Sequence, residues 1–179
     1  MSFSTVLQHT DFTLKAAIDL SKAEEFSKIV AANQNEFKFL PHTSQISTTE
    51  KAVAEITGFQ KKWQEGTMFF YFIFDKTDKI VGSVGIKIRD EKHVAEGCYW
   101  LDKKETGKGF VSKSIPLLEQ EVFKEGYHRF EIWCNADNKP SVHVPERLGY
   151  HLDGNLRELE YLFDAYHDVL IFSKLNTDK

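Results

Sequence analysis

The chain has 179 residues, a length that fits one domain, and 41% of them are apolar, which is enough for a buried core. Its formal net charge of −4 argues against nucleic-acid binding through a broad basic face, so no nucleic-acid partner is expected. No apolar stretch is long enough to span a bilayer. The start, Met1 to Ser4, lacks the pattern of a signal peptide. We therefore expect one domain over residues 1–179, in the cytoplasm and without membrane attachment.

The spacing of apolar residues changes several times along the chain and separates strands from helices. Capping residues mark the first two helices: Asp19 or Ser21 for one, and the capping-box pattern Ser47-Thr-Thr-Glu50 for the other, which ends at Gly66. In chain order, the expected elements are a strand (12–17), helices ending near 33 and 65 around a loop (35–47), strands (67–74, 80–88, 93–101), a charged loop (103–109), a helix (110–126), a strand (128–134), a helix (138–148) and two strands (150–160, 166–175).

This order of elements predicts the α+β class. Three successive strands over 67–101, joined by short turns, favour an antiparallel meander. The helix over 110–126 connects two strands that should be parallel neighbours, because a crossover of that length brings the chain back in the same direction. The expected architecture is a mixed, mostly antiparallel sheet of about seven strands flanked by helices.

The segment Lys104-Glu-Thr-Gly107-Lys-Gly109 directly follows a predicted strand and directly precedes a predicted helix. Glycines allow tight turns and close approach of a ligand to the backbone. The helix start supplies unpaired N–H groups and a partial positive charge, which together suit a pyrophosphate. The segment is not a Walker A loop and lacks the third glycine of a dinucleotide fingerprint. By itself this glycine spacing is a weak signal, and an ordinary strand-to-helix turn is the commoner explanation for it.

Several short motifs follow one another in a fixed order around this loop. They are Glu96-Gly-Cys-Tyr-Trp-Leu-Asp102, Gly107-Lys-Gly109, Arg129-Phe-Glu-Ile132, Asp137-Asn-x-x-Ser141, Glu146-Arg-Leu-Gly-Tyr150, Leu152-Asp-Gly154 and Tyr166-His-Asp168. The series resembles the GNAT superfamily of acyl-CoA N-acyltransferases, and within it the RimL-type branch, which includes ribosomal-protein-serine acetyltransferases. The resemblance covers Ile80 to Leu175 with little gap and implies the GNAT fold, whereas the first third matches only in outline.

The resemblance implies acetyl-CoA as the acetyl donor and assigns its contacts. The loop would hold the pyrophosphate through backbone N–H groups, and the strand end before it would pair with the pantetheine arm and place one N–H at the thioester oxygen. Asn138 would bind the pantetheine arm and Ser141 would reach the sulfur. The implied cofactor-binding residues are Tyr99, Trp100, Leu101, Thr106, Gly107, Lys108, Gly109, Phe110, Val111, Asn138 and Ser141.

A base is needed because an amine is mostly protonated at neutral pH and must lose a proton before it attacks. Glu160 is our candidate, since RimL-type enzymes carry a carboxylate at the matching position; Glu158, two residues earlier and expected on the same face, is the competitor. His42 and His143 are further candidates, although each is more typical of a surface residue. Ser141 is the candidate for stabilising the departing thiolate, so the predicted catalytic pair is Glu160 and Ser141.

Other titratable residues fit structural roles. Cys98 and Cys134 lie in apolar, strand-like runs and are expected to be reduced core thiols. The sequence contains no Cys/His cluster with the spacing of a metal site. It also contains no G-x-S-x-G elbow, which a serine nucleophile would require. Glu96, Asp102 and Asp137 are expected to be structural, and Pro116 should kink the helix that contains it.

The resemblance implies an acetyl-CoA-dependent N-acetyltransferase whose acceptor is most plausibly a protein amino terminus, by direct attack in a ternary complex. Two alternatives stay open: a small-molecule amine acceptor (a polyamine, an amino acid or an antibiotic), and a non-catalytic acyl-CoA-binding regulatory module. A homodimer is also expected, from the habit of RimL-type enzymes and from the aromatic run Phe69-Phe-Tyr-Phe72.

Overall fold

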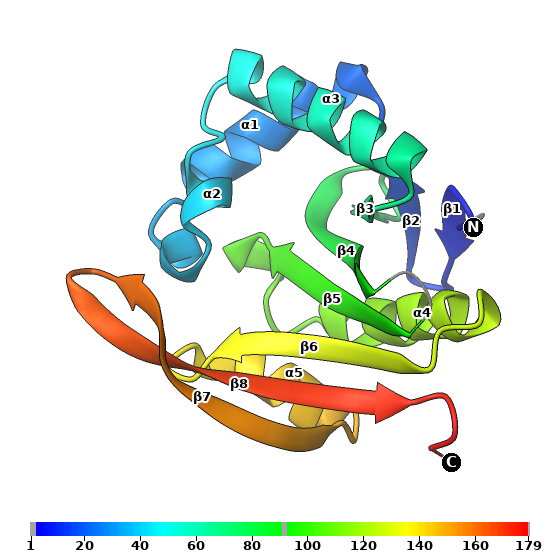
Figure 1. Cartoon of the computed structure of the whole chain (residues 1–179). Helices are drawn as coiled ribbons and strands as arrows, with labels where there is room; N and C mark the ends of the chain where they lie inside the picture. Colours follow the sequence, from blue (N-terminus) through cyan, green and yellow to red (C-terminus); the bar gives the residue numbers. More distant parts are fainter. Residues whose placement is uncertain (1–2, 91–92, 179) are drawn as a thin grey trace. The chain divides into compact units, whose positions relative to one another are not determined.

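The computed structural model describes residues 3–90 and 93–178. Met1 and Ser2, which belong to the start of the chain that was expected to lack the pattern of a signal peptide, lie outside the described part. The chain divides into two compact units (Figure 1). Unit 1 is Met1–Gly85 with Tyr99–Phe110, and unit 2 is Ile86–Cys98 with Val111–Lys179. Strands β4 (Ile80–Asp90) and β5 (Val94–Leu101) run through the division, so each unit contains part of both strands.

The sheet of unit 1 has the strand order β1-β2-β3-β4-β5. Strands β1 (Val6–Gln8), β2 (Phe12–Ala16) and β3 (Met68–Asp75) are antiparallel neighbours. Alternate residues of β2 are buried, as expected for a strand with one face on a core. Strand β3 is buried almost throughout, which explains its unbroken apolar sequence.

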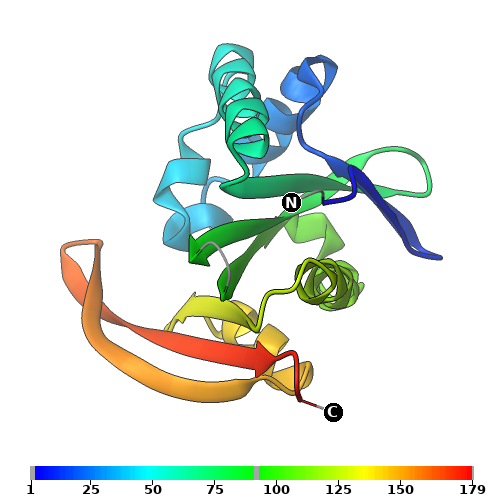
Figure 2. The same ribbon diagram turned by 45° about the vertical axis from the view of Figure 1, so that its right-hand side comes forward.

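Two helices, α1 (Ala23–Ala32) and α3 (Thr49–Glu65), lie side by side over the sheet of unit 1 (Figures 1 and 2). Asp19 accepts a hydrogen bond from the backbone of Ser21 and begins a short 3-10 turn, η1 (Leu20–Lys22), before α1. The cap of α3 is Thr48, one residue later than the capping box suggested, and Gly66 ends the helix with a φ of +71°. Two short elements lie between α1 and α3: η2 (Glu36–Phe39) and α2 (Pro41–Ser44).

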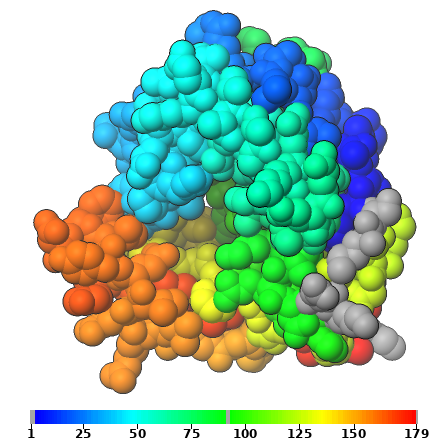
Figure 3. Space-filling model, turned by 45° about the horizontal axis from the view of Figure 1, so that its top comes forward, coloured from blue at the N-terminus to red at the C-terminus, as the bar shows by residue number. Residues whose placement is uncertain are grey.

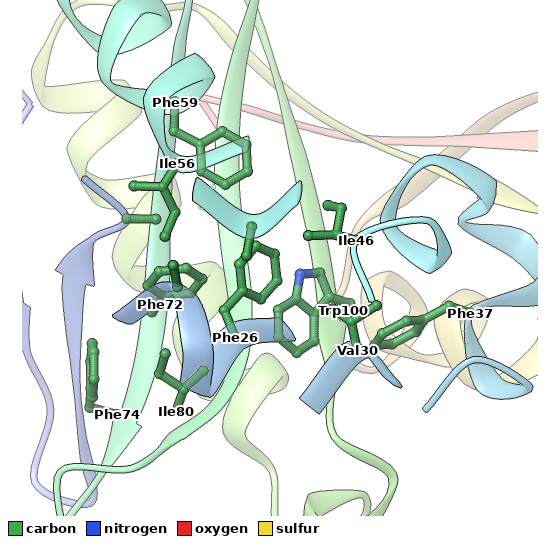
Figure 4. Close-up of a cluster of buried hydrophobic side chains, with 13 residues drawn as sticks. Phe26, Val30, Phe37, Ile46, Ile56, Phe59, Phe72, Phe74, Ile80 and Trp100 are labelled. Atoms are coloured by element: carbon green, nitrogen blue, oxygen red, sulfur yellow. The ribbon is translucent and has the colours of Figure 1, made fainter. Parts of the chain in front are cut away.

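The core of unit 1 is aromatic and is shared by the helices and the sheet (Figure 4). Phe26 of α1 stacks on Trp100 of β5 with ring centroids 5.7 Å apart, and Phe37 meets the same indole edge-on at 5.4 Å. Ile56 and Phe59 of α3 are buried in the same cluster at helical spacing. The aromatic content of the sequence is therefore used to attach α1, η2 and α3 to the sheet.

The sheet of unit 2 has the order β4-β5-β6-β8-β7. Strand β6 (Arg129–Asn135) is parallel to β5 and antiparallel to β8 (Ala165–Leu175), which confirms the expected parallel crossover. The crossover helix α4 (Phe110–Lys124) buries one apolar stripe and continues through Pro116. The second helix of this unit, α5 (Lys139–Arg147), follows β6.

Strands β7 (His151–Leu162) and β8 form a hairpin whose tip extends past the end of β6 (Figure 2). The register of β6 with β8 begins at Val169, and one further backbone bond, from Ala136 N–H to the carbonyl oxygen of Asp168 at 2.9 Å, lies beyond it. The part of β8 from Ala165 to His167 is in register with β7. Much of the tip is at the molecular surface, seen in orange in Figure 3. Large apolar side chains on the hairpin are exposed; they are Leu152, Leu156, Leu159, Tyr161, Phe163 and Tyr166.

The structure confirms the α+β class and a mixed, mostly antiparallel sheet flanked by helices. Among the described residues the sheet has eight strands, because the three-residue β1 was not expected from the sequence. Its short length gave no readable alternation. The expected loop over 35–47 contains η2 and α2, which are too short to show a helical period. Within the same described residues, no helix is long and apolar enough to cross a membrane.

Candidate active site

The glycine loop lies in unit 1, between the end of β5 and the start of α4. A 3-10 turn, η3 (Lys103–Glu105), begins it, and Gly107 and Gly109 follow with φ values of +83° and +81°. L-residues rarely adopt this left-handed region, so the two glycines are required by the backbone. A Cβ on Gly107 would meet nothing within 4 Å. The loop leads directly into the N-terminus of α4, where unpaired N–H groups favour an anion, and the space beside Gly107 is open.

The charged side chains of this loop differ in their surroundings. Lys108 is exposed, but its ammonium group lies 2.7 Å from a carboxylate oxygen of Glu105. Lys104 and Thr106 are exposed. Because Glu105 partly neutralises the cation of Lys108, a phosphate at this loop is left chiefly with the backbone N–H groups and the exposed side chains of Lys104 and Thr106 as donors.

The end of β5 was expected to contact the pantetheine arm through Tyr99, Trp100 and Leu101. The indole of Trp100 is 9% exposed and belongs to the core of unit 1, so this residue can offer a ligand only its backbone. Among the described residues, the register of β5 with β6 ends at the Gly97–Ile132 pair. Tyr99, Trp100 and Leu101 lie past the end of that pairing, as the prediction of a backbone contact requires.

Glu160 lies near the end of β7 in unit 2 and is held by one buried amide. The Nδ2 of Asn135 donates a hydrogen bond of 2.8 Å to Oε2 of Glu160. Asn135 is 6% exposed, and its own Oδ1 accepts a hydrogen bond of 3.0 Å from the N–H of Asp137. The amide therefore fixes one oxygen of Glu160 without neutralising the carboxylate, which is suitable for a group that accepts a proton.

A β-bulge precedes Glu160. The register between β7 and β8 shifts between Leu156 and Glu160, and Glu158 within the shift has a φ of +54°. Asp168 of β8 holds the bulge: its carboxylate accepts from the N–H of Glu158 at 2.9 Å and from Asn155 Nδ2 at 2.7 Å. These hydrogen bonds, chiefly the one from Glu158, lower the pKa of Asp168. The bulge interrupts the alternation from which the shared face of Glu158 and Glu160 was expected.

His167 ties the hairpin tip to the segment that follows β6. Its Nδ1 lies 2.8 Å from Oδ2 of Asp137, and its Nε2 lies 3.1 Å from the carbonyl oxygen of Leu162. Both partners are acceptors, so the doubly protonated ring satisfies both contacts. The hydrogen bond with Asp137 is the main reason why the pKa of His167 is raised.

Ser141 lies in the first turn of α5, where its Oγ is 3.3 Å from the Sγ of Cys134 on β6. Asn138 is the N-cap residue of the same helix, but its side chain does not cap the helix backbone. Both side chains are half-buried. The structure thus places an amide and a hydroxyl one turn apart at the start of α5, which is the arrangement expected for contacts with an extended ligand.

The other sequence candidates have local partners. His42 and His143 are exposed and lie 3.0 Å and 2.9 Å from Glu55 and Glu146, respectively. Asp102 accepts from the N–H of Lys104 and caps η3. Glu96 lies 3.1 Å from Arg89, and burial raises its pKa. Over residues 3–90 and 93–178, no three His, Cys, Asp or Glu side chains are grouped to hold a metal.

The sequence analysis did not predict three residues whose hydrogen bonds hold Glu160 or the part of the hairpin around it. They are Asn135, His167 and Asp168. Asn135 had one readable signal, since it is an amide directly after an apolar strand. His167 and Asp168 lay within a motif of the resemblance but had no assigned role. Their contacts join segments 10 to 30 residues apart, which spacing along a chain does not reveal.

The strand order, the parallel crossover and the left-handed glycine loop before α4 together define the class of acyl-CoA-dependent acyltransferases. A family model described as "Acetyltransferase (GNAT) domain" matches residues 13–151. The chain therefore belongs to the GNAT acetyltransferases, and it is an enzyme that uses acetyl-CoA as its acetyl donor.

Individual relatives have related names. The chain is 34% identical over 114 residues to the ribosomal-protein-serine acetyltransferase of Escherichia coli (strain K12); the match covers 63% of each chain, slightly under two thirds. It is similar to a solved RimL, a ribosomal L7/L12 α-N-protein acetyltransferase with coenzyme A, with TM-score 0.88, 27% identity, and coverage of 97% of this chain and 99% of that one. It is also similar to the microcin C7 self-immunity acetyltransferase MccE with acetyl-CoA and AMP, with TM-score 0.87, 30% identity and 93% of each chain covered.

Proposed function

We propose that this enzyme acetylates the N-terminal α-amine of a protein in the cytoplasm, and that residues 1–179 act as one domain. The acceptor follows from the similarity to the ribosomal-protein-serine acetyltransferase and to RimL. The single domain is supported by β4 and β5, which have residues in both compact units, and by the family model, which runs across them.

The proposed donor contacts are mostly backbone groups. Gly107 and Gly109, with their left-handed φ values, direct N–H groups of the loop toward the diphosphate of acetyl-CoA. Asn138 binds the pantetheine arm with the side chain that does not cap α5. The full proposed set is Tyr99, Trp100, Leu101, Thr106, Gly107, Lys108, Gly109, Phe110, Val111, Asn138 and Ser141.

The proposed chemistry divides between two side chains. Glu160, oriented by Asn135, takes a proton from the incoming amine directly or through one water. The amine nitrogen forms a bond to the acetyl carbon as the bond from carbon to sulfur breaks. A backbone N–H at Tyr99–Leu101 stabilises the negative charge that develops on the carbonyl oxygen. Ser141 stabilises the departing thiolate with its hydroxyl group.

The left-handed glycine pair before α4 is the observation that carries this proposal, and Gly109→Glu tests it. The new side chain adds a Cβ, backbone strain and an anion at the proposed phosphate site, so binding of coenzyme A measured by calorimetry should be lost. Gly66→Glu is the matched control: it also strains a left-handed glycine, and its new side chain enters open space at the end of α3. Unchanged affinity in a folded Gly109→Glu protein would remove the proposal.

A small-molecule amine is the second candidate acceptor, supported by the 30% identity to an acetyltransferase named for microcin C7 self-immunity. Mass spectrometry of products from acetyl-CoA with a panel of peptides, polyamines, amino acids and amine antibiotics separates the two. Acetylation of free but not blocked peptide amino termini supports the first acceptor. Turnover of small amines alone supports the second. Binding of coenzyme A without any turnover would indicate a regulatory module.

We also propose a homodimer. The aromatic run over 69–72 was one reason to expect a dimer. Phe69, Tyr71 and Phe72 of this run are buried within unit 1, so they are not available at a dimer interface. The exposed apolar side chains of the β7–β8 hairpin give the proposal better support. Light scattering at micromolar concentration should give twice the 20.7 kDa chain mass, and a monomer alone would contradict it.

A further inference from the structure

Asn33, at the end of α1, is a buried amide whose hydrogen bonds join distant segments of unit 1. It is 3% exposed. Its Nδ2 donates to the carbonyl oxygen of Ile29 at 2.9 Å and to Oδ1 of Asp102 at 3.1 Å. Its Oδ1 accepts from the N–H of Lys103 at 2.9 Å. Both donors and the acceptor of the side chain are therefore used, as burial of an amide requires.

Two of these bonds hold the first residues of the glycine loop. The N–H of Asp102 also bonds to the carbonyl oxygen of Val81 on β4 at 2.8 Å, so this residue is held from the sheet and from α1. The turn then closes through Glu105 N–H to Asp102 and Thr106 N–H to Lys103, at 2.9 Å and 3.2 Å. The acceptors of these two turn bonds, Asp102 and Lys103, are the residues that Asn33 contacts. The direction in which the chain enters Gly107 therefore depends on Asn33.

The carboxylate of Asp102 also accepts from the N–H of Lys104 at 3.2 Å, and Asn33 holds that carboxylate. An ion pair at this junction does not fix the loop to the same degree. The ammonium group of Lys103 pairs with Glu36 of η2, but both side chains are largely exposed. Exposed ion pairs contribute little because water screens them and both side chains lose freedom. Buried hydrogen bonds from a short, rigid amide restrict the backbone more strongly.

We propose that Asn33 is a positioning residue for the loop that binds the diphosphate of acetyl-CoA. This inference rests on the proposed function of that loop. A ligand that binds backbone N–H groups gains affinity when those groups already point correctly, because less conformational entropy is lost on binding. The helix α1 thus sets the affinity for the donor through Asn33, although Asn33 is not itself assigned a contact with the donor.

Asn33→Ala is the first test. Its dissociation constant for coenzyme A, measured by calorimetry, should rise about tenfold, and hydrogen exchange in peptide 102–110 should be faster. The kcat at saturating acetyl-CoA should change by less than about twofold, because the chemical groups are elsewhere. The matched control is Gln60→Ala, which removes an amide-to-carbonyl bond of 2.7 Å to Ile18 within the same unit. It should lower the melting temperature and leave affinity for coenzyme A unchanged.

A side-chain exchange supplies the second test. Asn33→Asp places a second carboxylate against Asp102 and should weaken coenzyme A binding at least as much as Asn33→Ala. Adding Asp102→Asn restores one donor and one acceptor between the two positions, with the direction of the bond reversed. The double variant should therefore recover part of the lost affinity, with a coupling of roughly tenfold between the positions, although the carboxylate at position 33 cannot replace the hydrogen bond to the carbonyl oxygen of Ile29.

Two results would overturn the inference. One is an Asn33→Ala protein with a lower melting temperature but affinity for coenzyme A equal to that of the unsubstituted chain, as in the Gln60→Ala control. The other, decisive if Asn33→Ala does not fold, is a folded exchange variant that regains none of the affinity lost in Asn33→Asp. Failure of the proposed function is seen separately, as unchanged affinity in Gly109→Glu.

Discussion

The aromatic core of unit 1 and the β7–β8 hairpin of unit 2 are built by different forces. Phe26, Ile56 and Phe72 of the core are at most 1% exposed. Tyr161, Phe163 and Tyr166 of the hairpin are all more than half exposed. The core is held by burial, which has no preferred direction, and it tolerates changes that preserve volume.

The hairpin takes its shape from directed hydrogen bonds. Asp168 fixes the bulge, Asn135 orients Glu160, and His167 joins the tip to Asp137. Such bonds determine where an atom points, which burial alone does not. The comparison teaches that the proposed base lies where directed hydrogen bonds, rather than burial, fix the positions of side chains. Substitutions in the two regions should therefore affect different quantities.

The largest effect is expected from Glu160→Gln. The amide keeps the size of the side chain and can still accept from Asn135, but it is not a base. The kcat should fall by roughly 10²–10⁴, with a smaller loss at high pH, where more of the amine is already neutral. Glu158→Gln is the matched control and should retain activity. Near-normal kcat in Glu160→Gln, with an unaltered pH profile, would place the base elsewhere.

Phe26→Ala should have the next largest effect, and on stability. It removes a buried ring that stacks on Trp100, and the cavity should lower the free energy of unfolding by about 3–5 kcal/mol. Arg157→Ala, at an exposed position of the hairpin outside the set of apolar side chains, is the control and should change it by less than about 0.5 kcal/mol. Chemical denaturation measures both. Equal losses in the two variants would erase the distinction between the regions.

Asp168→Ala should lower kcat by roughly 10- to 100-fold, because the bulge loses its two hydrogen bonds and Glu160 is misplaced. Affinity for coenzyme A should be unaffected. Adding Glu158→Gly should recover part of kcat, since glycine adopts the positive φ of this position without strain. The absence of any recovery, or a loss of coenzyme A affinity instead, would contradict this account of the bulge.

His167→Gln should give the smallest effect, and one that depends on pH. The raised pKa of His167 means that its contribution to stability is fully present below the ordinary value of about 6.5 and is lost as pH rises through the raised value. The groups that face this ring are Asp137, Glu160 and the carbonyl oxygen of Leu162. The difference in melting temperature between the two proteins should be largest near pH 6 and narrow in alkaline buffer. A difference that is independent of pH would exclude a charged His167.

The sequence by itself determined the elements of five or more residues and the glycine loop. Helical period located α1 and α3, the capping pattern placed the start of α3 to within one residue, and alternation located β2, because these signals lie within one element. The order of motifs also determined the family, which the comparison over residues 13–151 confirms. Gly107 and Gly109 were readable because a left-handed backbone leaves little choice of residue.

Only the tertiary structure decided which side chains meet. It brought Asn33 to Asp102, 69 residues apart, and Asn135 to Glu160, 25 residues apart. It also introduced the bulge at Glu158, which ended the alternation that a regular strand would have kept. A local pattern records the period of one element, whereas these contacts depend on how separate elements pack and on which polar groups are buried together. The same packing enclosed the ring of Trp100 and left only its backbone for a ligand.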